Sequence, residues 1–381
     1  MIAPVLCSIF LGLAVYHYAG YPFAVVVLAR LRGKVRLPPV PTDWPSVSLV
    51  IAAFNEEKVI AEKIRNSLSL RYPQDRYDII VVADGSNDST AQIVNSFADP
   101  RVRGLHDPQR RGKSHALNRA VAASQADIVV LSDANNMYSE DALELLVRRL
   151  SDATVGGVTG VKKVVQDISR QASTGDGLYW KYESKIKEAE SALGGTVTGD
   201  GEIFALRREF YSPIPQGVVN DDMYLTLQLV AKGKRVAYEP NATAVEEGSI
   251  TIREDVNVKI RMIAGGYQGV KHDAGIVFGS GWFTFKFISH KILRWLMPLF
   301  LIGLFVSNLF ALDQPFFQVV FAGQVILYAG ALLGCLLQAA RGHASVLYVP
   351  FYFVVMNIAA FAGLIRFFKG RQSALWVKAQ R

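Results

Sequence analysis

The chain has 381 residues, of which 51% are hydrophobic and 19% are charged. Such a length exceeds one ordinary soluble domain, and this composition lies between those of soluble and membrane proteins. The net charge of +8 is concentrated beside apolar segments and forms no basic–aromatic RNA-binding pattern, which indicates a membrane surface and no nucleic-acid partner. Cys7 and Cys335 lie far apart in apolar segments, which excludes a disulfide framework and a cysteine metal site.

The N-terminal segment is apolar and carries no charge from residue 2 to residue 29. About 20 such residues are enough to cross a bilayer. A signal peptide is the alternative, but no Lys or Arg precedes the apolar run. We therefore predict a transmembrane anchor over residues 1–36, with its N-terminus outside and its basic flank, which starts at Arg30, in the cytoplasm.

The central part of the chain, residues 37–270, alternates short strands with amphipathic helices. Strands are predicted at 47–51, 77–82 and 127–131, and Asn55 resembles the cap of a helix because two acids follow it. Alternation of this kind predicts an α/β domain with a mostly parallel, Rossmann-like sheet that is covered by helices on both faces.

Three further apolar runs, each long enough to cross a bilayer, occupy residues 292–311, 315–338 and 346–367. Residues 282–288 mix aromatic side chains with a lysine, as is typical of a helix that lies in the membrane interface. We therefore predict an interface helix and a transmembrane region over residues 271–381. Four crossings would place the C-terminal tail outside, whereas its basic residues favour the cytoplasm, so either one run does not fully cross or the charge rule fails here. The basic residues of the tail are Lys369, Arg371, Lys378 and Arg381.

Polar side chains follow three of the predicted strands, and ligands of such sheets bind at the carboxyl ends of the strands. Asp84 follows the second strand, although a turn acid before Gly85 is a common alternative. Asp133 and Asn135 follow a later strand and could reach one hard cation through oxygen, or could simply form an Asx turn. Three polar strand ends on one rim favour a binding site.

Two helix starts also carry candidate chemistry. Lys113 stands at the start of a predicted helix, where an ammonium suits phosphate oxygens, although a solvated lysine is the plainer alternative. Asp221 and Asp222 begin another helix, where carboxylates can either complement the helix dipole or supply a general base.

The order of these pieces resembles the family-two glycosyltransferases, the large inverting group with a GT-A fold that includes cellulose and hyaluronan synthases. The likeness covers about residues 45–270 and implies a GT-A domain. The matching stretches are residues 47–57, 79–90, 112–118, 129–135, 198–208 and 220–227.

The resemblance implies a UDP-sugar donor, a Mg²⁺ or Mn²⁺ ion and a role for each matching residue. Asp84 would contact the nucleotide, Asp133 would lie by the diphosphate and the metal, Asn135 by the metal, and Asp222 would be the catalytic base. The other residues with implied roles are Ala52, Asn55, Glu57 and Lys113 around the nucleotide, Arg261 at the diphosphate, and Gly199, Asp200 and Asp221 on the acceptor side.

The chain departs from the family pattern in two places. Asn135 replaces the second acid of the usual Asp-x-Asp motif, which removes a charge from the metal site. Val258 and Met262 stand where processive members carry Gln and an acceptor-stacking Trp. We therefore expect transfer to a lipid or lipid-linked glycan, rather than synthesis of a polysaccharide that would be threaded through the membrane with help from an oligomer or an export partner.

The resulting prediction is a multi-pass plasma-membrane enzyme with a cytoplasmic catalytic domain. It would transfer a sugar from a UDP-sugar to a hydroxyl group of a lipid-linked or polysaccharide acceptor and form a β-linkage. A processive synthase and a non-catalytic scaffold with a degenerate GT-A domain are the alternatives. Glu183 and Glu190 share a helix face, for which solvated or structural roles are favoured over catalysis, and Trp180 is expected in the core rather than as a sugar platform.

Overall fold

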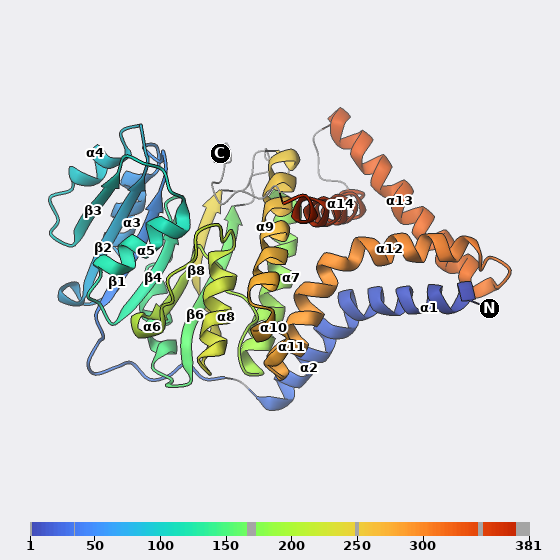
Figure 1. Ribbon diagram of the computed structural model, residues 1–381, viewed down its shortest axis with the longest axis horizontal. Coiled ribbons are helices and arrows are strands. Elements are labelled where there is room, and N and C mark those ends of the chain that lie inside the picture. The colour runs from blue at the N-terminus through green and yellow to red at the C-terminus, as the bar shows by residue number, and fades with distance from the viewer. Residues whose placement is uncertain (1, 34, 166–172, 248–250, 342–345, 371–381) are drawn as a thin grey trace.

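The computed structural model describes residues 2–33, 35–165, 173–247, 251–341 and 346–370. Figure 1 shows an α/β domain on one side and long apolar helices on the other. The chain begins with α1 (Ile2–Val15), passes through a π-helical turn (Tyr16–Gly20) and continues as α2 (Tyr21–Arg32). From there it runs to the first strand of the sheet.

The described residues form one eight-stranded sheet with the order β3-β2-β1-β4-β7-β6-β8-β5. Strands β1 to β4 run parallel to their neighbours among themselves, whereas β7 is antiparallel to both β4 and β6, and β5 is antiparallel to β8. This confirms the predicted α/β, Rossmann-like class, and the antiparallel strands are an addition to it. The strands are β1 (Val47–Ala53), β2 (Tyr77–Asp84), β3 (Val102–Asp107), β4 (Ile128–Asp133), β5 (Asn136–Tyr138), β6 (Val155–Val165), β7 (Phe204–Arg207) and β8 (Arg235–Glu247).

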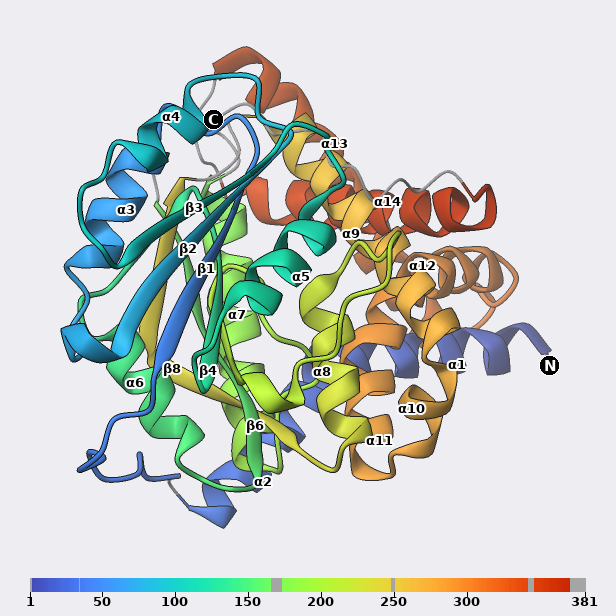
Figure 2. The same cartoon turned by 60° about the vertical axis from the view of Figure 1, so that its left-hand side comes forward.

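Strand β1 is buried along its whole length because helices cover both faces of the sheet (Figure 2). Leu49 and Ile51 pack into one core with α3 (Ile60–Leu68), α4 (Thr90–Asn95) and α6 (Ala142–Leu150). Val50 and Ala52, on the opposite face, pack into a second core with α5 (Lys113–Ala123) and α8 (Asp221–Ala231). A strand buried on both sides explains why its sequence is a continuous apolar run instead of an alternating one.

The predicted helix start at Asn55 is wrong, because the helix begins at Ile60. Asn55 has a φ of 54°, outside the helical region, and its side-chain oxygen accepts a hydrogen bond from the Asn87 backbone N–H at 3.0 Å. Asparagine tolerates this left-handed conformation better than most residues do. The residue therefore joins two loops at the sheet edge instead of capping a helix.

Two long helices connect the sheet to the apolar part of the protein. The first is α7 (Ser173–Ala192), and the second is α9 (Ile252–His272), which starts with a capping box formed by Thr251 and Glu254. On α9, Tyr267 stacks on Phe367 with ring centroids 5.5 Å apart. Helix α14 therefore lies beside α9.

The C-terminal part begins with two short helices, α10 (Ala274–Gly279) and α11 (Trp282–Phe287), and a π-helical turn (Ile288–Ile292). Then come α12 (Leu293–Leu309), α13 (Pro315–Arg341) and α14 (Tyr348–Phe368). Helices α1 and α12 lie side by side (Figure 1).

Four helical segments in the described part of the chain are long and apolar enough to cross a membrane. Three of them agree in position with predicted runs, whereas Trp282–Leu309 begins ten residues before the predicted run 292–311 and includes residues 282–288, which were predicted as a separate interface helix. Lys369 follows α14, whereas Arg371, Lys378 and Arg381 lie outside the described residues. The segments are Ile2–Arg32, Trp282–Leu309, Pro315–Leu337 and Tyr348–Phe368.

Candidate active site

The carboxyl ends of the parallel strands bring the predicted strand-end residues onto one rim. Ala52 lies in register with Asp133 on one neighbouring strand, and Ala53 lies in register with Ala83 on the other, directly before Asp84. Ala52 is buried, and its small side chain lets the neighbouring strands pack closely at this rim. Residues that are more than 80 positions apart in sequence therefore meet at the end of β1.

Lys113 lies at the centre of the acidic part of this rim. Its Nζ is 2.7 Å from Oδ1 of Asp133 and 3.3 Å from Oδ2 of Asp221. Burial lowers the pKa of Lys113, but these two carboxylates outweigh the effect and raise its pKa above the ordinary value. A solvated lysine, the alternative at this position, is wrong, because the side chain is only 19% exposed.

Asp221 and Asp222 open α8 next to this ion pair. Burial raises the pKa of Asp221, against the lowering effect of Lys113. Burial also raises the pKa of Asp222 to about 7, with further contributions from the charges of Asp221 and Asp200. A Cβ added at Gly201 would lie 3.5 Å from Oδ2 of Asp221 and 3.7 Å from Cβ of Asp222, so the chain at Gly201 passes close over both acids. A carboxylate with a pKa near neutrality is suited to accept and release protons.

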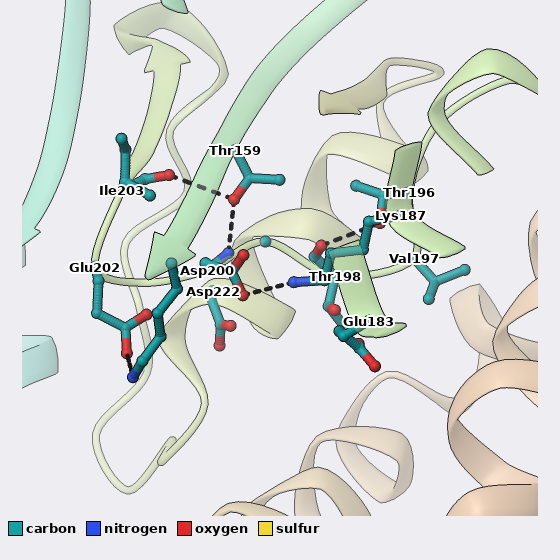
Figure 3. A network of polar contacts seen from close by, with 12 residues as sticks. Thr159, Glu183, Lys187, Thr196, Val197, Thr198, Asp200, Glu202, Ile203 and Asp222 are labelled. Atoms are coloured by element: carbon teal, nitrogen blue, oxygen red, sulfur yellow. Dashed lines mark hydrogen bonds and ion pairs between the residues drawn. The ribbon is translucent and has the colours of Figure 1, made fainter. Parts of the chain in front are cut away.

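The predicted acceptor-side residues lie on a loop that the surrounding elements hold tightly. The Gly199 N–H donates to the Thr226 hydroxyl at 3.1 Å, and the Asp200 N–H donates to Oγ1 of Thr159 at 2.8 Å. The Asp200 carboxylate lies 2.5 Å from Nζ of Lys187. Figure 3 shows the contacts of Asp200 with Thr159 and Lys187, and the Asp222 side chain close to that of Asp200. The loop therefore stands directly beside the candidate base.

A second ion cluster borders the site and was not predicted from the sequence. Nζ of Lys162 lies 2.6 Å from a carboxylate oxygen of Glu202 and 2.6 Å from one of Glu246. Burial opposes ionisation of Glu202, but Lys162 lowers the pKa of Glu202 to about 2. The Asn135 amide donates to Glu246 at 3.2 Å, which ties the candidate metal residue to this cluster. The only sequence signal was the position of Glu202 within the family-like stretch 198–208.

Two of the residues predicted around the nucleotide, Asp84 and Glu57, accept hydrogen bonds from backbone N–H groups and so hold loops in place. Both oxygens of Asp84 accept from backbone N–H groups, those of Arg111 and of Gly112, the latter at 2.6 Å. Asp84 therefore fastens the loop that leads into α5 and positions Lys113. The carboxylate of Glu57, an exposed residue, accepts from the Ser89 N–H at 3.0 Å.

Helix α9 borders the acidic end of the site with Arg261 and Met262. Burial lowers the pKa of Arg261, while the charges of Asp221 and Asp133 act in the opposite direction, so the guanidinium interacts electrostatically with both carboxylates. Met262 is 38% exposed, and its backbone oxygen accepts from the Asn220 amide at 2.8 Å. Arg261 thus adds a second cation to the side of the site where Lys113 lies.

A divalent cation fits this site only if another molecule completes its coordination. The side chain of Asp133 is 30% exposed, and Asn135 is half-buried nearby. Within the described ranges, no group of three or more His, Cys, Asp or Glu side chains could enclose a metal ion. One carboxylate and one amide oxygen are few ligands for a hard cation, so the phosphates of a nucleotide would have to supply others.

Trp180, which was expected in the core, lies in a charged environment instead. Trp180 is half-buried and its ring faces the ammonium groups of Lys162, Lys187 and Lys259 at 5.1, 5.9 and 5.4 Å, so it lies beside the ion clusters instead of in an apolar core.

Glu183 is buried on the face of α7 that also contains the buried Lys187 and Glu190. Its carboxylate pairs with Lys291 at 2.8 Å, with Arg294 at 2.6 Å and with His290 at 3.2 Å.

Glu190, seven residues further along α7, accepts from Tyr21 at 2.5 Å and contacts Nδ1 of His290 at 2.9 Å. A solvated role for the two glutamates is therefore wrong, and the structural role is confirmed. Together they connect α7 to the apolar segments that contain Tyr21 and His290.

The fold is that of the GT-A class. Along nearly the whole chain the structure superposes on a mannosyltransferase, PcManGT from Pyrobaculum calidifontis, solved in complex with GDP-Man and Mn²⁺, with a TM-score of 0.72, 23% identity and coverage of 96% of this chain and 99% of that one. Residues 48–214 match the family model described as glycosyl transferase family 2. Residues 48–214 therefore match a family-two glycosyltransferase domain, in agreement with the resemblance seen in the sequence.

Curated relatives support the same family. The chain is 39% identical over 220 residues to the probable glycosyltransferase YdaM of Bacillus subtilis, covering 54% of this chain and 51% of that one. It is 28% identical over 232 residues to β-monoglucosyldiacylglycerol synthase of Synechocystis, covering 59% and 48%. It is 23% identical over 236 residues to poly-β-1,6-N-acetyl-D-glucosamine synthase of Staphylococcus aureus, covering 61% and 57%. The matches span only about half of the length of these relatives.

Proposed function

We propose that the protein is a membrane-bound inverting glycosyltransferase that transfers a sugar from a UDP-sugar to a hydroxyl group of a lipid or lipid-linked glycan. The observation that carries the proposal is the position of Asp222. This carboxylate has a pKa of about 7 and lies one residue from Asp221, which pairs with Lys113 beside Asp133. A proton acceptor thus stands next to cations that suit a diphosphate.

In this mechanism Asp222 accepts the proton of the acceptor hydroxyl as its oxygen forms a bond to the anomeric carbon of the donor sugar. The bond from that carbon to the diphosphate breaks on the opposite face, so the new linkage is β and UDP leaves with the bonding electrons. Lys113 and Arg261 stabilise the negative charge of the leaving diphosphate. The chain at Gly201, where an added Cβ would lie 3.7 Å from Cβ of Asp222, covers one side of the half-buried Asp222.

Asp133 and Asn135 are the residues that would hold a Mg²⁺ or Mn²⁺ ion, together with the donor phosphates. A bound divalent cation would neutralise charge on the diphosphate and so improve it as a leaving group. The structurally similar mannosyltransferase was solved with GDP-Man and Mn²⁺, which supports this arrangement. The same similarity makes GDP-sugars a donor class that must be tested beside UDP-sugars.

The acceptor proposal rests on the four apolar helices and on the relatives. Helices at both ends of the chain would hold the domain against the bilayer. A relative named as a glycolipid synthase supports a lipid acceptor, and one named as a polysaccharide synthase supports the alternative of processive synthesis. Met262, which stands where processive members carry a stacking Trp, favours single transfer.

We further propose a plasma-membrane location with the catalytic domain in the cytoplasm. Basic residues follow the first apolar segment, and two of them, Arg30 and Arg32, lie in the last turn of α2. They support this orientation because basic residues favour the cytoplasmic side. The pairing of Asp133 and Asp221 with Lys113 opposes the second alternative, a non-catalytic scaffold.

The test is release of the nucleoside diphosphate by the purified full chain, screened over UDP- and GDP-sugars with Mg²⁺ or Mn²⁺ and a membrane lipid extract. We expect one donor to support turnover that EDTA abolishes and added metal restores. Asp222→Asn should abolish turnover while nucleotide binding persists. Asp75→Asn, at a side chain that is 83% exposed, is the matched control and should turn over like the wild type. Wild-type turnover by Asp222→Asn would refute the assignment of the base.

A further inference from the structure

A separate cavity of about 280 Å³ lies at the opposite end of the sheet from the candidate active site. It is lined by Arg235, the first residue of β8, and by Lys234 directly before it, whereas Glu246 near the end of the same strand borders the candidate active site. Gly195, after α7, and Trp282 and Lys286, on α11, form another part of its wall. None of these residues takes part in the proposed transfer reaction.

The charged side chains that line this cavity are all cations. They are Lys234, Arg235 and Lys286, and no carboxylate belongs to the described residues of the lining. Arg235 pairs with Asp152 at 2.5 Å, outside the lining, and Nζ of Lys234 donates to a backbone carbonyl at 3.0 Å. The charge of the cavity is therefore only partly balanced by the protein.

Lys286 is the most unusual of the three cations because it is only 1% exposed. In the described part of the chain its ammonium donates to the Gly195 carbonyl and forms no ion pair within 4.0 Å, although the buried carboxylate of Glu190 lies close enough to interact electrostatically with it. Buried lysines are almost always paired with an anion, since an unpaired buried charge is strongly destabilising. Lys286 lines the cavity with no carboxylate of the described residues in direct contact, so an anion in the cavity would complete the partners of its ammonium.

The position of the cavity indicates the kind of anion. Trp282, in its wall, is the first residue of the apolar segment Trp282–Leu309 and is 46% exposed. Phe285, one helical turn further, is 45% exposed and stacks on Trp282 at 5.0 Å. Exposed aromatic side chains at the end of a membrane-spanning segment mark the level of the lipid headgroups, where basic pockets bind anionic lipids.

We propose that this cavity binds the phosphate group of an anionic phospholipid from the leaflet that faces the catalytic domain. The proposal rests on the membrane placement given above and adds a lipid site that is distinct from the acceptor site. Lys286 contacts the phosphate from inside the cavity, and Lys234 and Arg235 contact it from the rim. A free phosphate shares this chemistry but does not bring the acyl chains that lie against Trp282 and Phe285.

The test measures binding of phosphatidylglycerol to the purified full chain by native mass spectrometry and by titration in phosphatidylcholine nanodiscs. Lys234→Gln and Arg235→Gln should each weaken binding about fivefold, the effect of removing one cation near a membrane surface. Lys271→Gln removes an exposed lysine outside the cavity and should leave binding unchanged. Lys286→Gln should have the largest effect, and its thermal unfolding is measured in parallel because the residue is buried.

Two results would overturn the proposal. Equal phosphatidylglycerol binding by Lys234→Gln, Arg235→Gln and the wild type would show that the cavity is not the lipid site. Displacement of the lipid by inorganic phosphate at comparable concentration would show that the ligand is a free phosphate. Because these variants lie outside the candidate active site, nucleotide release is measured separately. Loss of lipid binding with normal turnover supports the lipid site. Absence of turnover in the wild type and in every variant would refute the proposed function and would leave the lipid site untouched.

Discussion

Replacement of Asp222 by asparagine should stabilise the folded protein at alkaline pH at the same time as it abolishes sugar transfer. Burial and two neighbouring carboxylates raise the pKa of Asp222 from 3.8 to about 7 in the folded state. The folded state therefore holds this proton more tightly than the unfolded chain does. As the pH rises from about 4 to about 7, the unfolded chain releases the proton first, and the free energy of unfolding falls.

The size of the effect follows from the pKa difference. One pKa unit corresponds to about 1.4 kcal/mol, so a shift of this size costs at most about 4 kcal/mol once the pH exceeds 7. Asp222 is half-buried, and water screens part of the repulsion, so we expect roughly 2 kcal/mol. The asparagine variant has no ionisable group at this position, so its free energy of unfolding does not fall by this amount.

The assay is thermal unfolding of the wild type and of Asp222→Asn in detergent, at several pH values between 5 and 9. The two melting temperatures should differ least at pH 5, should separate as the pH rises to about 7 and should keep a constant difference above it, with the variant the more stable protein. A variant that is equally stable or less stable at pH 9 would refute the electrostatic reasoning. Wild-type kcat/KM for nucleotide release should rise about tenfold per pH unit below pH 7 and level off above it, because it follows ionisation of the base in the free enzyme.

Three further changes test other parts of the structure, each by thermal unfolding of the purified full chain. Lys113→Met should destabilise by about 3 kcal/mol because it leaves two carboxylates of the site without their cation, and equal stability to the wild type would contradict that pairing. Glu183→Gln should cost about 3 kcal/mol, since Lys291 and Arg294 lose their anion and His290 loses a carboxylate partner, whereas Glu188→Gln on the exposed face of the same helix should be neutral. Gly199→Ala should cost about 1–3 kcal/mol because its new Cβ would lie 2.7 Å from the ring of Phe204, and an unchanged melting temperature would show that the loop yields.

The local parts of the fold could be predicted from the sequence because local patterns determine them. A continuous apolar run such as that of β1 is buried on both faces wherever helices flank it. The four apolar segments are recognisable from length and composition alone. The antiparallel strand β7 was missed, since its four residues are too few to show a pattern, and the order of strands depends on pairing across the whole sheet.

The same limit applies to the site. The carboxylates of Asp133 and Asp222 were recognisable as candidates from strand ends, helix starts and family resemblance. Their partners were not, because Lys113 meets Asp221 from 108 positions away in the sequence, and nothing local to either residue specifies the other. Asn55 shows the opposite case, in which a plausible local capping signal lost to a hydrogen bond from Asn87 in another loop.

The amino-acid sequence by itself determined the class of the protein, the position of its apolar helices and the identity of its acidic residues, because these depend on composition and short-range periodicity. Only the tertiary structure decided which charges pair, which pKa values shift and where a buried lysine faces a cavity. Ion pairing and desolvation depend on distances of a few ångströms between segments that are distant along the chain, and the folded arrangement alone sets those distances.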